Sequence, residues 1–172
     1  MIQLGKYNVS LYPNTGFVYE NHGGNIVFNG NAIIGNASAL SVGKTGSVEF
    51  GSNFCASCSF KLTSYHKIIF EDNVLCGWDC LFMDTDFHKI TSLRDDKLLL
   101  PYGKIHIGHD SWIANQCSVM KNTMLPEYTI VAGRSLLNKK VESPYSLLAG
   151  CPAKVIKYGV YRNINDDIIH YD

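Results

Sequence analysis

Three side chains that can take up or release a proton lie close together in the stretch MDTDFHKI, namely Asp84, Asp86 and His88. An imidazole titrates near neutral pH, so His88 is the side chain here best suited to act as a general base toward a hydroxyl group. The two aspartates could orient its ring or bind a hydroxyl of a substrate. The alternative is a histidine and two aspartates in a solvated surface loop, and the surrounding sequence has to decide between the two.

A six-residue repeat follows this stretch. From Ile107 to Glu142 the sequence divides into IGHDSW, IANQCS, VMKNTM, LPEYTI, VAGRSL and LNKKVE. Each group begins with an aliphatic residue, and the fifth residue is small in all but the last. The first positions are Ile107, Ile113, Val119, Leu125, Val131 and Leu137, and the small fifth positions are Ser111, Cys117, Thr123, Thr129 and Ser135. A period of six fits neither a helix nor a lone strand, but it fits a coil of three short flat faces stacked as a β-helix. First and fifth positions should then point inward, and a third-position residue such as Lys121 outward.

The repeat also precedes His88, with a ten-residue and an eight-residue step that interrupt it. Its leading positions there are Phe28, Ile34, Leu40, Phe50, Ala56, Leu62, Phe70, Cys76 and Phe82. We therefore expect an all-β fold in a single domain over residues 1–172. The expected boundaries are a lead-in over residues 1–25, coils over 26–82 and 107–142, an active-site loop over 83–106 and a C-terminal extension over 143–172.

The loop is expected because TDFHKITSLRDDKLLLPYGK breaks the repeat, and long loops on a rigid scaffold usually carry function. Its three leucines, Leu98–Leu100, would be unfavourable in water, so the loop should lie against an apolar surface such as a neighbouring subunit. In the extension, VIK predicts a short strand. The tail after it predicts either a short helix that begins near Asn163 or Asn165, or a frayed end.

The cysteines raise the possibility of a zinc site. Cys55 and Cys58 are followed by Cys76 and Cys80, which is close to a four-thiolate spacing, although the second pair is one residue too wide for the common form. Cys76 and Cys80 also occupy first and fifth positions of the repeat, and Cys117 another fifth position. We therefore favour buried thiols in a reducing compartment and expect no metal.

Bulk composition excludes several classes of partner. Fifteen basic and fifteen acidic residues cancel over the 172 residues, and neither sign forms a long run. This leaves no electrostatic footprint for nucleic acid or anionic lipid. Because no stretch of about eighteen apolar residues and no signal-like N-terminus occurs, we expect no membrane insertion and a cytoplasmic protein.

A family resemblance is carried by the repeats from Ile107 onward, which read IGHDSWIANQCSVMKNTMLPEYTIVAGRSLLNKKV, and by the later AGCPAKVIK. They resemble the hexapeptide-repeat acyltransferases, most closely the maltose and galactoside, xenobiotic and polysaccharide O-acetyltransferases. The resemblance is strongest over residues 68–157. It implies a left-handed parallel β-helix, a homotrimer with active sites between subunits, and acetyl transfer from acetyl-CoA to a sugar hydroxyl, as in surface polysaccharide biosynthesis.

The resemblance also implies roles for individual residues. His88 stands in the place of the catalytic histidine, and Trp112 in the place of the tryptophan that follows the loop, where it could stack on substrate or pack beneath the loop. Asp84 and Asp86 are candidates to bind the sugar or to orient His88 because they lie close to it in the sequence, not because of the resemblance. The implied acetyl-CoA contacts are Asn115, Gly133, Asn138, Lys139, Lys154 and Lys157. The sequence departs from the family pattern in IANQ, which lacks the usual glycine after isoleucine, and in a stretch between Lys140 and Ala149 that is one residue longer.

A second class of function remains open. Some left-handed β-helices resemble carbonic anhydrases and bind zinc through three histidines, and His88, His106 and His109 are candidates for such a set. Their spacings of eighteen and three residues do not match that family's wider pattern. A β-helix protein without enzymatic activity is the remaining alternative.

Overall fold

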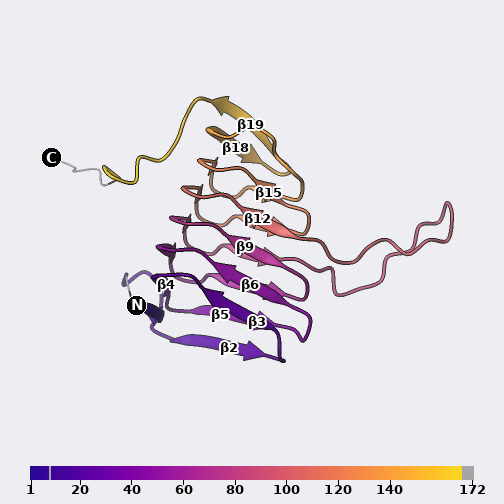
Figure 1. The fold of residues 1–172 in the computed structure, drawn as a ribbon, viewed down its shortest axis with the longest axis horizontal. Coiled ribbons are helices and arrows are strands. Elements are labelled where there is room, and N and C mark those ends of the chain that lie inside the picture. The colour runs from indigo at the N-terminus through magenta and orange to yellow at the C-terminus, as the bar shows by residue number, and fades with distance from the viewer. Residues whose placement is uncertain (8, 168–172) are drawn as a thin grey trace.

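The computed structural model describes residues 1–7 and 9–167, and they form a coil of short strands with one long protruding loop (Figure 1). The strands make three sheets, which we call faces A, B and C. Face A contains β1 (Ile2–Lys6), β4 (Ala32–Gly35), β7 (Phe54–Ala56), β10 (Leu75–Cys76), β13 (Trp112–Ile113), β16 (Ile130–Val131), β18 (Ser146–Gly150) and β19 (Ala153–Tyr158). Face B contains β2 (Phe17–Asn21), β5 (Ser38–Val42), β8 (Lys61–Ser64), β11 (Leu81–Met83), β14 (Ser118–Met120) and β17 (Leu136–Leu137). Face C contains β3 (Asn25–Phe28), β6 (Ser47–Phe50), β9 (Ile68–Phe70), β12 (Ile105–Ile107) and β15 (Met124–Leu125).

The chain visits faces A, B and C in turn, so each circuit adds one strand to every sheet. Neighbouring strands within a face are parallel, as in the register Leu81↔Ser118 between β11 and β14. The exception is β19, which turns back and pairs antiparallel with β18. The all-β parallel coil expected from the six-residue repeat is therefore confirmed, as is the short strand at VIK.

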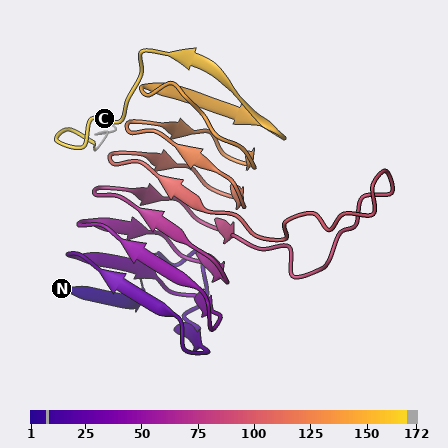
Figure 2. The same cartoon turned by 45° about the vertical axis from the view of Figure 1, so that its right-hand side comes forward.

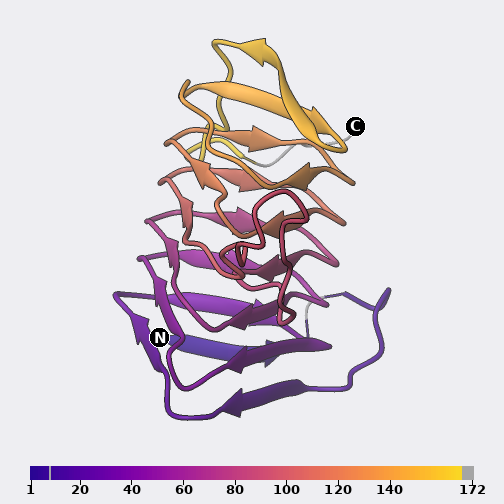
Figure 3. The ribbon, with the colours of Figure 1, turned by 90° about the vertical axis from the view of Figure 1, so that its right-hand side faces the viewer.

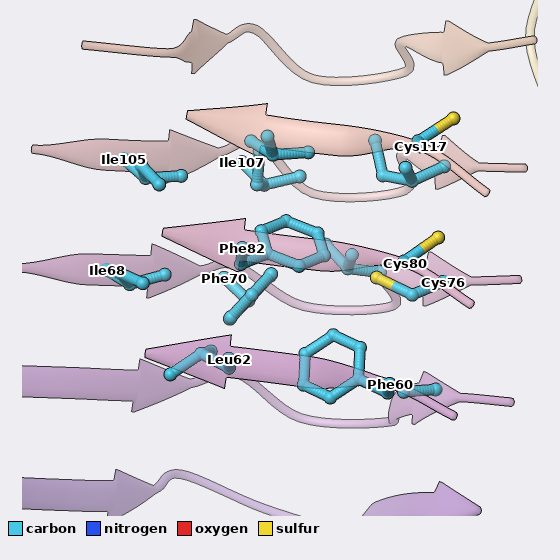
Figure 4. Close-up of a cluster of buried hydrophobic side chains, with 14 of the residues drawn as sticks. Phe60, Leu62, Ile68, Phe70, Cys76, Cys80, Phe82, Ile105, Ile107 and Cys117 are labelled. Atoms are coloured by element: carbon cyan, nitrogen blue, oxygen red, sulfur yellow. The ribbon is translucent and has the colours of Figure 1, made fainter. Parts of the chain in front are cut away.

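The interior confirms the assigned frame. Every first-position residue from Ile107 to Leu137 is at most 3% exposed, and the small fifth-position residues are at most 2% exposed. Identical or similar side chains stack from one circuit to the next. Phe28, Phe50 and Phe70 lie nearly parallel, with ring centroids 4.8 and 5.3 Å apart. Figure 4 shows Phe82 in the same layer as Phe70 and Ile107 in the next layer, where Ile107 pairs with Phe70.

The fifth position is small and often polar because it closes the corner. Thr129 Oγ1 donates to the carbonyl of Pro126 at 2.8 Å, and Ser135 Oγ to that of Ala132 at 2.6 Å. The thiol of Cys117 donates to the carbonyl of Ala132 at 3.2 Å. A buried carbonyl at each corner thus finds a donor that a larger apolar side chain would not supply.

The fourth position of the repeat adopts a left-handed backbone conformation. This holds for Asp110, Gln116, Asn122, Tyr128 and Arg134, with φ between 55° and 67°. Such a conformation costs roughly 1–2 kcal/mol for most residues other than glycine. The packing of the inward neighbours therefore has to offset a recurrent local strain.

The expected boundaries need two corrections. Residues 1–25 are not a lead-in, because β1 pairs in parallel with β4 and β2 with β5, so both strands belong to the coil. The long connection between β1 and β2 hides the six-residue frame there. The loop covers residues 84–104 rather than 83–106, since β12 begins at Ile105, which is fully buried.

For the tail, the sequence left a short helix and a frayed end open. The described part of it, up to residue 167, forms turns and no helix, with the amide of Asp166 donating to the carbonyl of Asn163 at 3.1 Å. The remainder of the expected terminal helix lies outside the described residues.

The loop 84–104, which we call the arm, projects from the corner between faces B and C (Figures 1 and 2). Two isolated antiparallel bridges, Thr85↔Tyr102 and Thr91↔Leu98, hold its two limbs together. Leu98–Leu100 are 49–61% exposed and Leu93 is fully exposed. In a single chain the arm therefore leaves its apolar side chains in water. In Figure 3 the coil is seen from the side, and the arm points toward the viewer in front of it.

Over residues 1–7 and 9–167 no helix occurs that is long and apolar enough to cross a membrane.

Candidate active site

The arm begins and ends at a firmly bonded root. The amide of Asp86 on the outgoing limb donates to the carbonyl of Pro101 on the returning limb at 2.7 Å, and the amide of Gly103 donates to the carbonyl of Asp84 at 3.0 Å. These bonds add to the Thr85↔Tyr102 bridge. His88 lies two residues beyond this root, so the coil fixes the point from which it projects.

Asp84 does not point toward a substrate. Its side chain is fully buried and accepts hydrogen bonds from Ser64 Oγ at 2.7 Å, the amide of Tyr65 at 2.8 Å and the amide of His66 at 2.9 Å. A carboxylate with three donors and no exposed surface has no oxygen left for a sugar. This differs from the expected substrate contact: Asp84 instead holds the preceding corner, one circuit away.

Asp86 is also engaged elsewhere. Its Oδ2 lies 2.5 Å from Nζ of Lys121, which also donates to the carbonyl of Leu100 at 2.7 Å. Lys121 points outward as the frame predicts, but its side chain is only 23% exposed, so it is not the neutral surface position that the frame alone suggests. Among the described residues neither aspartate hydrogen-bonds to His88.

Phe87 directly precedes His88 and has a left-handed backbone conformation. It has a φ of 60°, and its amide donates to Thr85 Oγ1 at 3.3 Å. Its ring packs edge-on against Tyr65, with the centroids 5.1 Å apart. A left-handed phenylalanine is a strained conformation of the kind that is enriched at functional sites. His88 follows directly, exposed and without a hydrogen bond to any described residue, so its imidazole is available to a substrate.

Trp112 lies beside a hollow of about 220 Å³ at the corner between faces A and B. It lies in strand β13 rather than at a turn, and its indole points outward, 37% exposed. The hollow is lined by Ser57, Leu75, Gly77, Trp78, Trp112, Ala114 and Asn115. Two of the expected residues, Trp112 and Asn115, are therefore brought together.

Trp78 is a member of this hollow that the sequence reasoning missed. It is 39% exposed and occupies the third, outward position of the group that begins at Cys76. A large aromatic residue at an outward position of a repeat is the signal that could have identified it.

Gly133 lies one circuit from Asn115 at the same corner. A Cβ atom on Gly133 would come within 2.8 Å of Asn115 Oδ1, so the glycine lets the amide side chain lie flat against the corner. The amide of Arg134 donates to the carbonyl of Asn115 at 3.0 Å. Asn115 and Gly133 thus form one continuous exposed surface beside the hollow.

The expected cationic residues are divided between two places. Lys139 and Lys154 line a hollow of about 360 Å³ at the C-terminal end of the coil, between the segment 139–143 and β19. Asn138 and Lys157 lie outside this hollow: Asn138 is exposed at the corner between faces B and C, and Lys157 is exposed on β19 opposite Leu147.

The candidate residues of one chain therefore occupy different corners. His88 projects from the corner between faces B and C, whereas Trp112, Asn115 and Gly133 lie at the corner between A and B. One chain does not bring the candidate base and the hollow of Trp112 together.

A further hollow, of about 390 Å³, lies over face C and the corner between faces C and A. His109 lines it, with Nδ1 2.6 Å from Asp110 Oδ2, and nearby His106 has Nε2 2.9 Å from Glu71 Oε1. These two histidines are thus paired with carboxylates, and they lie away from His88: His106 in strand β12 on face C, and His109 at the corner between faces C and A. The part of the chain that the structure describes holds no group of three or more side chains arranged to bind a metal.

The cysteines lie where the repeat places them. Cys58, Cys76, Cys80 and Cys117 are fully buried, and burial raises the pKa of the Cys76 thiol well above its usual value. Cys55 is half-buried, Cys151 is exposed, and all six are free thiols.

Comparison with proteins of known sequence gives acetyltransferases. A protein from Lysinibacillus sphaericus named "Probable macrolide acetyltransferase" is 32% identical over 126 residues, which cover 73% of this chain and 58% of the relative. A chloramphenicol acetyltransferase from Agrobacterium fabrum (strain C58) is 34% identical over 70 residues, covering 41% of this chain and 31% of the relative. This chain therefore spans less than two thirds of the length of both. An uncharacterised 24.8 kDa protein from the cps region of Klebsiella pneumoniae is 27% identical over 91% of this chain and 69% of its own. No family model matches the sequence.

Comparison with solved structures identifies the fold. The polySia-specific acetyltransferase NeuO matches with a TM-score of 0.63 at 18% identity, over 88% of this chain and 91% of its own. The galactoside acetyltransferase in complex with coenzyme A matches with a TM-score of 0.62 at 22% identity, over 86% and 70%. The fold is the left-handed parallel β-helix of the hexapeptide-repeat acetyltransferases, which confirms the expected fold class.

Proposed function

We propose that this protein is an acetyl-CoA-dependent O-acetyltransferase of the hexapeptide-repeat type that modifies a hydroxyl group of a saccharide. The observation that carries this proposal is His88, an exposed imidazole without a partner among the described residues, which follows a strained residue at the root of the arm. Sequence relatives that are acetyltransferases support the reaction class.

The proposed donor site is the surface at the corner between faces A and B. The hollow beside Trp78 and Trp112 is mostly apolar and would take the pantetheine arm, and the exposed surface at Asn115 and Gly133 would continue it. Among the relatives, a galactoside acetyltransferase has been solved with coenzyme A. Amide and aromatic groups of this kind suit a long, flexible and partly polar ligand.

The phosphates of CoA need cations. Lys139 and Lys154, which line one hollow, are the proposed phosphate contacts, with Lys157 further along the exposed strand β19 and Asn138 at the adjoining corner. Ammonium groups that remain partly hydrated bind phosphate as point charges, so their contribution should fall with ionic strength.

In the proposed reaction His88 is the general base. Its neutral imidazole takes the proton from the acceptor hydroxyl as the oxygen attacks the thioester carbonyl. The tetrahedral intermediate then collapses, the C–S bond breaks, and the imidazolium returns the proton to the departing thiolate of CoA. No acetyl-enzyme is formed. The amides of Trp112 and Ala114 already donate to the carbonyls of Thr129 and Val131, so the donor that stabilises the oxyanion has to be another group.

A complete site requires two chains in this proposal. His88 and the hollow at Trp112 occupy different corners, and the exposed leucines of the arm need an apolar partner. A homotrimer in which the arm of each subunit reaches the corner between faces A and B of the next would satisfy both requirements and close the symmetry. The active-site segment is then the arm, residues 84–104.

The proposed acceptor is a saccharide. Phe87, which directly precedes His88 in the chain, packs edge-on against Tyr65, and both rings are partly exposed. Aromatic faces of this kind can form a platform for a sugar ring. Two of the similar structures, the galactoside and polySia-specific enzymes, act on sugars by name, and the relative from Klebsiella pneumoniae belongs to a cps region. We propose a role in surface polysaccharide biosynthesis. We also propose a cytoplasmic location, because all six cysteines are free thiols and a reducing compartment keeps thiols free.

The test is the release of free CoA thiol from acetyl-CoA in the presence of a panel of sugars and polysaccharide fragments. His88→Ala should lower turnover with an identified acceptor by ~10²–10⁴-fold, because it removes a positioned general base. Acetyl-CoA affinity should stay nearly unchanged, since the lost interaction belongs to the transition state.

Lys89→Ala, next in the sequence and equally exposed, is the matched control and should keep normal turnover. Near-normal turnover of His88→Ala would remove His88 from the mechanism. A trapped acetyl-cysteine would replace direct transfer with a two-step route.

A further inference from the structure

The arm has few contacts of its own to define its position. Residues 87–100 are almost all exposed, and the two isolated bridges join its limbs to each other rather than to the coil. A catalytic group on such a segment needs a fixed anchor, because a misplacement of about 1 Å can lower a rate by about 10²-fold.

Lys121 supplies an anchor from the next circuit of the coil. It follows β14 at the corner between faces B and C, and its ammonium contacts both limbs of the arm. On the outgoing limb it lies 2.5 Å from Asp86 Oδ2, and on the returning limb it donates to the carbonyl of Leu100 at 2.7 Å. The side chain of Lys121 thus links the coil to both limbs of the arm, which are far apart in the sequence from Lys121 and from each other.

The surroundings make this contact stronger than an ordinary surface ion pair. The side chains of Lys121 and Asp86 are only 23% and 28% exposed, so water and salt screen them incompletely. The amide of Asp86 is bonded to the carbonyl of Pro101, so the carboxylate is held on a fixed backbone. Charge-assisted bonds with both partners held in place are among the stronger contacts in proteins.

We propose that Lys121 and Asp86 are positioning residues that lock the arm and thereby fix His88. The chain from the lock to the imidazole is short: Asp86 is held by Lys121, Phe87 takes its left-handed turn against Tyr65, and His88 follows. Asp86 therefore acts through the backbone rather than by touching the sugar. This inference rests on the proposed role of His88, and it adds a residue, Lys121, from outside the arm.

The test compares Lys121→Met, which keeps the length of the side chain but removes its charge, with Lys121→Arg, which keeps the charge. Lys121→Met should lower kcat by about 10–100-fold without changing the Kd of acetyl-CoA, and Lys121→Arg should recover most of the loss. Asp86→Asn should lower kcat in the same way. The double variant Lys121→Met/Asp86→Asn should lose little more than either single variant, because both remove the same contact. Lys61→Met, an exposed lysine on β8, is the matched control and should behave as the wild type.

A second readout does not depend on activity. Amide hydrogen exchange over residues 84–104 should accelerate in Lys121→Met and Asp86→Asn but not in Lys61→Met or His88→Ala. If the wild type shows no transferase activity while exchange still responds to Lys121, the lock stands and the proposed function fails. Wild-type kcat in Lys121→Met, additive losses in the double variant or unchanged exchange would each overturn the lock.

Discussion

His88 and its two neighbouring aspartates have separate tasks. The aspartates were candidates for orienting the imidazole, yet Asp84 is buried against the preceding corner and Asp86 is paired with Lys121. In the proposed mechanism the base, His88, has no carboxylate partner among the described residues, so its position depends on the backbone before it, where Phe87 has a left-handed conformation. At the residue level the proposed site therefore depends on positioning rather than on a proton relay.

Lys154 should separate donor binding from chemistry. Lys154→Ala is expected to weaken acetyl-CoA binding by about 3–10-fold at low salt while kcat at saturating acetyl-CoA changes little, because an exposed ammonium binds ground state and transition state alike. Isothermal titration with acetyl-CoA at two salt concentrations measures the effect. Lys44→Ala, exposed near the other end of the coil, is the control. A larger loss in kcat than in affinity would contradict the phosphate assignment.

Tyr12 predicts a pH dependence of stability. Its hydroxyl donates to Asp79 Oδ2 at 2.5 Å, and this bond to a carboxylate raises the pKa of Tyr12 to about 12. In the unfolded chain a tyrosine titrates near 10. Because folding favours the protonated form of Tyr12, the bond to Asp79 contributes fully to the free energy of unfolding below about pH 10. This contribution is lost as the pH rises through about 12.

Urea unfolding at pH values between about 9 and 12 measures this contribution. The wild-type free energy of unfolding should exceed that of Tyr12→Phe at pH 9, and the difference should shrink toward pH 12. Tyr7→Phe, an exposed neighbour, serves as the control. A difference that is constant over the whole range would show that the bond to Asp79 does not form in solution.

At the level of the strands, the six-residue period was the most informative feature of the sequence. It predicts which residues point inward because each coil face holds only two inward positions, and these must be apolar or small. The six-residue period did not predict the strands before Ile26. Both early strands, β1 and β2, pair with the coil, but the long connection between them interrupts the period.

The site was less predictable than the coil. The family resemblance predicted roles for His88, Trp112 and Asn115, which stay predictions, but it gave no sign of Trp78, which lies on an adjacent circuit and lines the same hollow as Trp112 and Asn115. It also could not anticipate the partners of Asp86, because contacts between circuits join residues about 18 or more positions apart in the chain. The six-residue period predicts the corner at which a residue lies. It does not predict which side chains of neighbouring circuits are in contact.

Strand β8 offers a matched test of the frame. Leu62 is 3% exposed and points into the coil, whereas the adjacent Lys61 is exposed. Leu62→Asp should destabilise the protein by several kcal/mol, comparable with the whole free energy of unfolding of a domain, because it buries an unpaired carboxylate. Lys61→Asp should change the melting temperature only slightly. Equal melting of the two variants would mean that the inward face has been misassigned.

For the whole molecule, the exposed leucines of the arm predict self-association. Light scattering at micromolar concentration should give the mass of a trimer. Replacing Leu98, Leu99 and Leu100 by Ser should shift the mass toward the monomer and abolish turnover together, since each site would need two chains. A stable wild-type monomer, or an active monomeric variant, would rule out sites shared between subunits.

The arm is inserted without disturbing the register of the coil. β11 ends at Met83 in step with β8 and β14, and β12 resumes at Ile105 in step with β9 and β15. The register of the stacked strands is therefore independent of the length of the arm. Evolution can therefore exchange or lengthen this segment while the scaffold stays intact. An engineer could graft an arm from a protein of the same fold at residues 84–104 without redesigning the core, and under the proposed function this would change the acceptor.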